Sequence, residues 1–379
     1  MRIAFDARLV TYRRGIGNFV FHLIQQYAYL APEYEFILYV DSERAYSNIP
    51  KCPHCRVRHL GHLPYPIWEQ VLLPIALHFD RPDILHCPAN TGPLWIPPGI
   101  RLVQTINDVI YLLPTHVLST SPTLYHRLGR EYRRLVAPRV AQQAKAIITI
   151  SGYSRQDILK YLEVPDSKLH VILGAPNSAC RVMKEKAALA AVRTKYSLDA
   201  PFVLALGAID PRKNTARIIK AYARFRQQSP GRYQLALIGL PPAGIVIFQR
   251  LAKSLKVADD VVLVSFVPED DLVGLYNAAE MLVYPSLYEG FGLPVLEAMA
   301  CGTPVIASPS GSIPEVAGDA ALLIDPNDTD ALARAMIQVA LDNRLRQRLI
   351  ELGFEQARKF SWEKAAMETL NIYKECMRQ

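Results

Sequence analysis

The sequence from Tyr284 to Pro304 reads YPSLYEGFGLPVLEAMACGTP and is the stretch that says most about the fold. A buried strand is predicted to end at Tyr284, after which Gly290 and Gly292 open a loop and a helix begins near Pro294. The free N–H groups and the positive end of such a helix favour an anion bound just beyond the strand. The stretch therefore predicts a strand–loop–helix unit that binds an anionic ligand.

Two carboxylates belong to this unit. Glu289 lies in the loop, and Glu297 lies in the helix eight residues later. A carboxylate accepts hydrogen bonds from hydroxyl groups, and acceptance from a diol is a common way to hold a ribose. The two side chains are therefore predicted to hold sugar hydroxyls at both ends of one ligand. The alternative for Glu297 is that it only caps or solvates the helix.

Outward from this unit, apolar runs of strand length alternate with helical stretches along the whole chain. The predicted strands are 3–6, 36–40, 83–87, 102–106, 146–150, 170–173, 202–206, 234–238, 261–264, 281–284, 304–307 and 321–324. Two runs of this alternation predict an α/β protein with two doubly wound, Rossmann-like parallel sheets. Ligands of such sheets bind beyond the carboxyl ends of the strands, so we expect a site in a crevice between the two domains.

The domain boundaries follow from the same pattern. The N-terminal domain is placed at 1–176 and is expected to bind the acceptor, and the second domain is placed at 177–360. A closing amphipathic helix at 361–379 could pack back on the N-terminal domain.

Composition narrows the class of protein. The chain has 379 residues, of which 50% are hydrophobic, and no apolar run is long enough for a membrane-spanning helix. Its first residues read as a strand and not as a signal peptide, so residence in the cytoplasm is the expectation.

Net charge is +8, and the densest basic stretch is opposed by Glu131 alone. That stretch comprises Arg127, Arg130, Arg133, Arg134, Arg139 and Lys145. It could face an anionic membrane at the inner leaflet or a phosphorylated acceptor, and it could equally be a solvated helix face. No nucleic-acid-binding motif accompanies the charge, so binding to nucleic acid is not expected.

Six cysteines are scattered through a chain without an export signal, so reduced thiols are expected. One cluster, Cys52, Cys55, His59 and His62, offers four ligands for zinc. The spacing between its two pairs is shorter than in familiar zinc modules, which favours an irregular loop that leads into a strand.

At this point the chain resembles a known family. Residues 284–304 look like the Glu-x7-Glu signature of glycosyltransferase family 4, retaining enzymes of the GT-B fold. Gly207–Asn214 resembles the phosphate-binding loop of that family, and further family-like segments lie at 14–18, 149–154, 311–321 and 360–362. A match to one of these segments arises easily by chance, whereas matches to all of them in the same order do not.

The resemblance implies roles for named residues. Arg212 and Lys213 would hold the donor diphosphate, and cations in this place would stabilise the charge that develops on the leaving group. Glu297 would hold the ribose, and Glu289 would lie near the transferred sugar.

The resemblance also implies backbone contacts to the donor. Amides of Gly290, Phe291, Gly292 and Leu293 would touch sugar and phosphate, Gly15 and Gly17 would allow close backbone approach, and the segment around Val267 would hold the base.

One segment departs from the family pattern. Thr105-Ile-Asn-Asp108 resembles a family segment that usually reads Thr-Ile-His-Asp. Asn107 replaces the histidine, and an amide cannot act as a general base. The mechanism usually proposed for the family needs no such base, so Asn107 is interpreted as a positioning group. Asp108 would orient the acceptor or serve the structure.

An Asp-x-Asp triplet at Asp328–Asp330 matches the metal-binding signature of other glycosyltransferases. It opens a predicted helix, where Asp is a favoured cap, so we interpret it as a cap and predict transfer without a metal or other cofactor.

The function predicted from the sequence is transfer of a hexose to a glycan, as in bacterial mannosyltransferases of surface polysaccharide assembly, which the segments at Gly15 and Asp210–Asn214 resemble most. The predicted donor is GDP-mannose, with a UDP-hexose or another GDP-sugar as the alternative, and the predicted acceptor is lipid-linked. A catalytically inactive, sugar-nucleotide-binding homologue is a further alternative, supported by Asn107 alone. A dinucleotide oxidoreductase is disfavoured because the first strand–helix junction lacks a full Gly-x-Gly-x-x-Gly.

Overall fold

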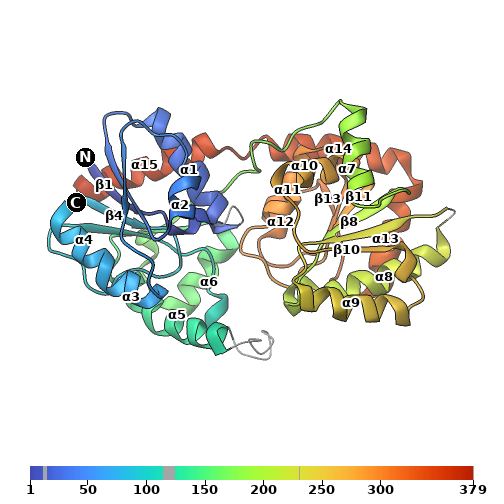
Figure 1. The fold of residues 1–379 in the computed structure, drawn as a ribbon, viewed down its shortest axis with the longest axis horizontal. Coiled ribbons are helices and arrows are strands. Elements are labelled where there is room, and N and C mark those ends of the chain that lie inside the picture. The colour runs from blue at the N-terminus through green and yellow to red at the C-terminus, as the bar shows by residue number, and fades with distance from the viewer. Residues whose placement is uncertain (12–14, 114–123, 230, 379) are drawn as a thin grey trace. The chain divides into compact units, whose positions relative to one another are not determined.

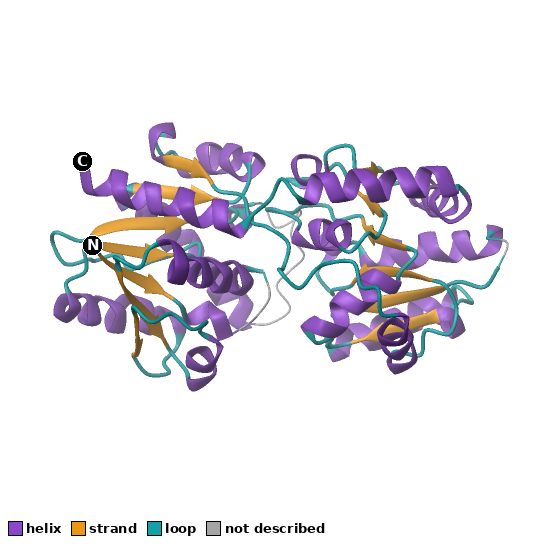
Figure 2. Cartoon of the chain, turned by 90° about the horizontal axis from the view of Figure 1, so that it is seen from above, coloured by secondary structure: helices purple, strands orange, loops and turns teal. Residues whose placement is uncertain are grey.

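The computed structural model describes residues 1–11, 15–113, 124–229 and 231–378 (Figure 1). The chain forms two compact units. Unit 1 comprises Met1–Gly174 together with Ser361–Gln379, and unit 2 comprises Ala175–Phe360. Each unit has one parallel sheet with helices on both faces (Figure 2).

The sheet of unit 1 has the strand order β3-β2-β1-β4-β5-β6-β7. Its strands are β1 (Arg2–Asp6), β2 (Glu35–Val40), β3 (Cys55–His59), β4 (Ile84–Cys87), β5 (Arg101–Thr105), β6 (Ala146–Thr149) and β7 (Leu169–Val171). Its helices are η1 (Arg8–Thr11), α1 (Ile16–Leu30), α2 (Glu43–Asn48), α3 (Tyr65–Ile67), η2 (Trp68–Leu72), α4 (Leu73–Asp80), η3 (Ile110–Leu112), α5 (Leu124–Gln143), α6 (Gly152–Leu162), η4 (Asp166–Lys168) and α15 (Trp362–Arg378).

The sheet of unit 2 has the order β10-β9-β8-β11-β12-β13. Its strands are β8 (Phe202–Leu206), β9 (Gln234–Ile238), β10 (Val261–Val264), β11 (Met281–Tyr284), β12 (Val305–Ala307) and β13 (Ala321–Leu323). Its helices are α7 (Lys186–Lys195), η5 (Pro211–Lys213), α8 (Thr215–Gln228), α9 (Pro242–Ser254), η6 (Ala258–Asp260), α10 (Glu269–Ala278), α11 (Leu293–Ala300), α12 (Ile313–Ala317), α13 (Thr329–Leu341) and α14 (Asn343–Ala357).

The α/β class and the two parallel sheets are as the sequence predicts, because strands buried on both faces read as continuous apolar runs. Helices α2 and α7 were not predicted, and both are short or rich in alanine and lysine with little buried surface.

In each sheet the strand order reverses at one point, between β1 and β4 in unit 1 and between β8 and β11 in unit 2. At such a point the loops after two neighbouring strands leave in opposite directions and open a crevice at the carboxyl edge. The loop after β8 carries Arg212 and Lys213, and the loop after β11 carries Glu289.

The closing helix α15 belongs to unit 1, where it contacts α1 (Figure 1). The Tyr373 hydroxyl lies 2.5 Å from Nδ1 of His86 in β4, and 3.2 Å from the hydroxyl of Tyr27. Trp362 stacks on His22 and meets Phe19 edge-on. These buried contacts attach the last helix to the first sheet across the whole length of the sequence.

Candidate functional site

The loop after β8 is held in shape by its own side chains. The Asp210 carboxylate accepts a hydrogen bond from the N–H of Arg212 at 3.0 Å and caps η5. The same carboxylate pairs with the Arg212 guanidinium, with Nη2 and Oδ2 2.6 Å apart. Asn214 follows in the left-handed region, at φ 57°, and its side chain donates to the Pro285 carbonyl at 3.1 Å. Asparagine tolerates this backbone conformation better than most residues, which explains its place before α8.

The loop after β11 meets this loop directly. The N–H of Leu287 donates to the carbonyl of Arg212 at 2.7 Å. Nζ of Lys213 lies 2.5 Å from Oε1 of Glu289 and donates to the Tyr284 hydroxyl at 2.8 Å. Tyr284 in turn donates to the same oxygen of Glu289 at 2.7 Å. A cation, a carboxylate and a phenol from two neighbouring strands thus form one cluster.

This cluster is largely removed from water. The side chains of Lys213 and Glu289 are 29% and 13% exposed, and Tyr284 is buried. Burial raises the pKa of the Tyr284 hydroxyl well above its usual value, and the negative charges of Glu289 and Glu297 raise it further. Tyr284 therefore stays a donor at neutral pH.

A third segment supports the loop that carries Glu289. Gly311 has φ +63°, and a Cβ built there would lie 2.4 Å from the carbonyl oxygen of Glu289. Ser312 donates from its hydroxyl to the carbonyls of Glu289, at 3.1 Å, and Phe291, at 2.7 Å. The sequence resembles the family in this segment, but no role was predicted for these two residues. Only the close approach after β12 reveals that they support the loop.

The amino end of α11 begins as the sequence predicts. Gly292 adopts φ +104° and precedes Leu293, the first residue of the helix. The Phe291 ring is buried and meets Phe360 edge-on, so this residue can offer only its backbone to a ligand. Gly290 lies between these residues and Glu289, and its amide belongs to the same turn.

Glu297 lies inside α11 and is buried. Its Oε2 accepts a hydrogen bond from the Tyr276 hydroxyl of α10 at 3.1 Å. Burial raises the pKa of Glu297 to about 7, against its ordinary 4.5, and the hydrogen bond from Tyr276 opposes this shift in part. The predicted alternative of a solvated helix residue is wrong, because a solvated carboxylate would be exposed.

The segment around Val267 follows β10, the edge strand, and Val267 is buried. β10 lies two strands from β8 in the sheet. At about 4.8 Å per strand, the loop after β10 lies roughly 10 Å from the loop that carries Lys213. Both loops leave the carboxyl edge of one sheet, with a spacing that suits two parts of an extended ligand.

In unit 1, Gly15 and Gly17 follow β1. Gly15 adopts φ 51° and is the residue before α1. No heavy atom lies within 4 Å of a Cβ built on Gly15, so the backbone angle and not crowding favours glycine there. Gly17 is buried in the first turn of α1.

Asn107 and Asp108 follow β5 in the same unit. The amide of Asn107 is buried and donates to the carbonyl of Pro88 at 3.1 Å, while its backbone N–H donates to Oδ1 of Asn90 at 2.8 Å. The Asp108 carboxylate accepts a hydrogen bond at 3.2 Å from the N–H of Ile110, the first residue of η3. Both side chains have hydrogen-bond partners within unit 1.

The possible metal ligands predicted around Cys52 and Cys55 lie in unit 1. Among the described residues one group, Cys52, His54 and Cys55, has ligand atoms within 4.8 Å of one another, and His59 and His62 do not belong to it. Cys52 and Cys55 form a disulfide, so the expectation of reduced thiols is wrong for this pair. Two cysteines separated by a tight turn are brought together by the turn itself.

Asp328 accepts hydrogen bonds from the N–H groups of residues 330 and 331, which confirms it as a helix cap.

Both halves of the chain match known protein families. Residues 13–175 match the family described as Glycosyltransferase Family 4, and residues 192–356 match the family described as Glycosyl transferases group 1.

The chain is similar to several bacterial proteins. Over 277 residues the chain is 37% identical to the O-antigen chain mannosyltransferase B of Escherichia coli, which covers 72% of this chain and 70% of that protein. It is 33% identical over 228 residues to the serotype-specific mannosyltransferase WbdA of Escherichia coli, where the match covers 59% of this chain and only 28% of the relative. The structure is similar to that of Anabaena HepE in complex with UDP and glucose, with a TM-score of 0.77, 17% identity and coverage of 99% and 100% of the two chains. At that identity the similarity establishes the fold alone.

Proposed function

The chain belongs to glycosyltransferase family 4 and has the GT-B fold, and from this membership we propose that it transfers mannose from GDP-mannose to a glycan with retention of the anomeric configuration. The observation that carries the proposal is the contact between Lys213 and Glu289 at the point where the sheet of unit 2 reverses its strand order. This is the place where open parallel sheets bind nucleotides.

The donor-free cluster is nearly neutral, because Lys213 pairs with Glu289 and Arg212 pairs with Asp210. A nucleotide diphosphate would add negative charge and compete with Glu289 for the Lys213 ammonium. Transfer of Lys213 to the phosphate would free the Glu289 carboxylate to accept hydrogen bonds from hydroxyls of the sugar. The cluster thus changes partners when the donor binds, and no buried charge is left unpaired.

Arg212 would act on the same diphosphate. Its pairing with Asp210 uses Nε and Nη2 of the guanidinium and leaves Nη1 outside the pair. A guanidinium oriented by a carboxylate is fixed before the ligand arrives, which lowers the entropic cost of binding.

In the proposed reaction the bond between the anomeric carbon and the phosphate oxygen breaks, and negative charge develops on the departing diphosphate. Lys213, Arg212 and the amides at the start of α11 would stabilise that charge. The acceptor hydroxyl attacks the same face of the sugar, and its proton passes to the leaving phosphate oxygen. This route requires no general base, which agrees with the structural hydrogen bonds of Asn107.

Metal-independent transfer is part of the proposal, since two side-chain cations supply the charge that a divalent ion would provide. The Asp328 triplet caps α13 and supports this interpretation. Addition of EDTA should leave the transfer rate unchanged, and a loss restored by Mg²⁺ would contradict this part.

Mannose is the proposed sugar because the similar proteins of Escherichia coli are mannosyltransferases. A UDP-hexose is the alternative donor, since the similar structure of HepE holds UDP and glucose. The acceptor is proposed to be a lipid-linked glycan at the inner face of the membrane, because O-antigen chain assembly is the context of the first relative. No helix among the described residues has the length and hydrophobicity to cross a bilayer.

The proposal is tested by thermal protection with a panel of nucleotide sugars, followed by a transfer assay with the donor that protects best. Lys213→Ala and Glu289→Ala should reduce kcat at least a hundredfold, while Lys220→Ala, an exposed lysine of α8, should not. Donor hydrolysis and transfer that survive both substitutions unchanged would refute the assigned cluster. Protection by a donor without any transfer would indicate an inactive sugar-nucleotide-binding homologue.

A further inference from the structure

Of the three side chains that meet in the cluster of Lys213, Glu289 and Tyr284, the tyrosine belongs to a strand. Tyr284 is the last residue of β11, where it pairs with Ala307 of β12, and it is 3% exposed. Lys213 is the last residue of η5, and Glu289 lies in the loop after β11. A lysine ammonium sits on a flexible four-carbon stem, whereas a buried ring on a sheet backbone has little freedom to move. The Tyr284 hydroxyl is therefore a fixed point beside two charged groups that can move.

The polar atoms of these three residues form a closed triangle. Nζ of Lys213 lies 2.5 Å from Oε1 of Glu289 and 2.8 Å from the Tyr284 hydroxyl, which lies 2.7 Å from the same Oε1. A tyrosine hydroxyl has a single hydrogen to donate. Because burial raises the pKa of Tyr284 well above its usual value, that hydrogen stays in place and goes to Glu289, while the hydroxyl oxygen accepts from Lys213. Tyr284 is thus bonded to both partners of the ion pair.

The Glu289 carboxylate keeps one oxygen for another partner. Both of its hydrogen bonds go to Oε1, and Oε2 accepts none in the part of the chain that the structure describes. The side chain is 13% exposed and lies at the edge where the strand order of unit 2 reverses. Each carboxylate oxygen can accept hydrogen bonds from hydroxyl groups. Oε2 is therefore available to a hydroxyl of a ligand while Oε1 stays with Tyr284.

The hydrogen bond from Tyr284 matters most when Lys213 leaves Glu289. A diphosphate would attract the Lys213 ammonium, whose side chain is 29% exposed, and Glu289 would then lose its cation. Among the described residues, the partner that remains to the carboxylate is Tyr284. A partly buried carboxylate with no donor is costly, whereas one that keeps a hydrogen bond is less so. Tyr284 therefore lowers the cost of separating the ion pair and keeps the carboxylate oriented.

We propose that Tyr284 is a positioning residue for the transfer reaction, whose hydroxyl holds the Glu289 carboxylate in place for the sugar while Lys213 moves to the diphosphate. The role rests on the proposed function, since it requires a diphosphate that competes for Lys213. A nucleotide sugar satisfies both separated groups, because phosphate oxygens accept from Lys213 and a sugar hydroxyl donates to Glu289. A nucleoside diphosphate satisfies Lys213 alone and leaves Glu289 dependent on Tyr284. The two kinds of ligand should therefore respond differently to the loss of the hydroxyl.

The test is Tyr284→Phe, which removes the hydroxyl and keeps the ring, whose centroid lies 5.0 Å from Nζ of Lys213. Binding of GDP, UDP, GDP-mannose and UDP-glucose is measured by calorimetry for the wild type and the variant. The Kd of the nucleoside diphosphate that the wild type binds should increase about tenfold, as expected for a lost hydrogen bond to a charged group. The Kd of the corresponding nucleotide sugar should increase less than about threefold, since a sugar hydroxyl replaces the lost donor. With that nucleotide sugar, kcat should decrease about tenfold, because the carboxylate loses its orientation.

A double-mutant cycle with Glu289→Gln separates positioning from a general structural effect. In the Glu289→Gln background no charge is left unpaired when Lys213 moves to the phosphate. Adding Tyr284→Phe should therefore change the Kd of the nucleoside diphosphate less than about twofold in that background. A purely structural role of the hydroxyl would give the same loss of affinity in both backgrounds.

The matched control is Tyr222→Phe in α8 of the same unit. Tyr222 is buried, and its hydroxyl donates to the carbonyl of Tyr233 at 2.7 Å, so the control also loses one hydrogen-bonded tyrosine hydroxyl. It should bind all four compounds as the wild type does. Thermal unfolding of both variants should show similar small decreases in Tm, so a difference in Kd between them comes from the cluster.

Equal losses of affinity for the nucleoside diphosphate and the nucleotide sugar would overturn the role of Tyr284. A tenfold loss that persists in the Glu289→Gln background would overturn it too, as would unchanged binding and kcat in Tyr284→Phe. Any of these results with a wild type that transfers a hexose leaves the proposed function in place. Failure of the wild type to bind any of the four compounds would instead contradict the proposed function, and the role of Tyr284 with it.

Discussion

Glu297→Gln is the substitution whose effect on stability follows most directly from the structure. Glu297 is buried in α11 with one hydrogen bond, from Tyr276, and its pKa is raised to about 7. In the unfolded chain the same carboxyl has an ordinary value of 4.5. The charged form is therefore the form that folding disfavours, and a neutral amide of the same shape avoids this cost.

The magnitude follows from linkage. The folded protein binds a proton at Glu297 more tightly than the unfolded chain, so the free energy of unfolding is highest below pH 4.5 and decreases as the pH rises towards 7. A difference of about 2.5 in pKa corresponds to roughly 3 kcal/mol. Glu297→Gln should therefore stabilise unit 2 by about 3 kcal/mol at pH 8 and by less than about 1 kcal/mol at pH 5.

The assay is thermal unfolding of the donor-free protein at both pH values. For a unit of this size, 3 kcal/mol corresponds to an increase in Tm of roughly 6–12 °C at pH 8. Glu351→Gln, an exposed position of α14 in the same unit, is the control and should give the same small shift at both pH values. An equal gain at pH 5 and pH 8, or destabilisation that grows with pH, would refute the reasoning that burial determines the pKa. The variant should also bind the proposed donor about tenfold more weakly, since an amide accepts from a diol less well than a carboxylate.

Three further substitutions test contacts that stabilise unit 1 or unit 2. Gly311→Ala places a Cβ 2.4 Å from the Glu289 carbonyl, so it should destabilise unit 2 by about 2–3 kcal/mol and abolish thermal protection by the donor. Asn107→Asp replaces a buried amide that donates to a carbonyl by a carboxylate that cannot, so chemical denaturation should show a loss of about 1–3 kcal/mol, larger at pH 8 than at pH 5. Tyr373→Phe removes the hydroxyl partner of His86 and should lower the transition of unit 1 by about 1–3 kcal/mol, with the transition of unit 2 unchanged.

The fold was predictable because buried parallel strands leave a plain pattern in the sequence. The runs at Phe202–Leu206 and Met281–Tyr284 are apolar throughout, and both form strands where predicted. The order of the strands was not predictable, since each strand pattern is compatible with several neighbours. The adjacency of β8 and β11 is nevertheless what brings Lys213 to Glu289.

The candidate site was predictable in its residue types more than in its contacts. The sequence indicates a cation after one strand and a carboxylate after another, and these are the residues that meet. It does not indicate that Arg212 pairs with Asp210, because a carboxylate two residues away is as compatible with a helix cap as with an ion pair. It also gives no sign that Ser312 supports the Glu289 loop, since the two are far apart in sequence and serine is common in loops.

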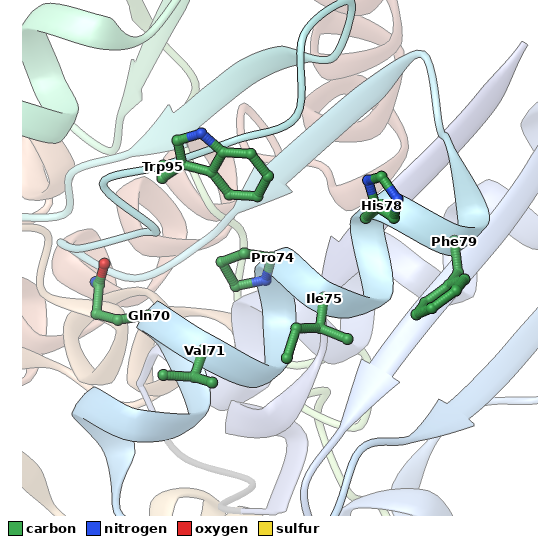
Figure 3. A pocket seen from close by; sticks show the side chains of 7 residues that line it. All are labelled: Gln70, Val71, Pro74, Ile75, His78, Phe79 and Trp95. Carbon is green, nitrogen blue, oxygen red and sulfur yellow. The ribbon is translucent and has the colours of Figure 1, made fainter.

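The helix at residues 65–80 shows why the spacing of apolar residues alone does not tell which side of a helix is buried. The sequence predicts a helix over residues 67–79, and apolar residues occur on all of its sides. The buried side of the helix is marked by Glu69 and Asp80, whose carboxylates accept hydrogen bonds from the hydroxyls of Tyr132 and Tyr39. A charged residue normally indicates the solvent side, but here the two carboxylates are buried and four apolar side chains are exposed: Ile67, Val71, Ile75 and Phe79 (Figure 3 labels the last three). The distinction depends on residues far away in sequence, so it arises only in the folded chain.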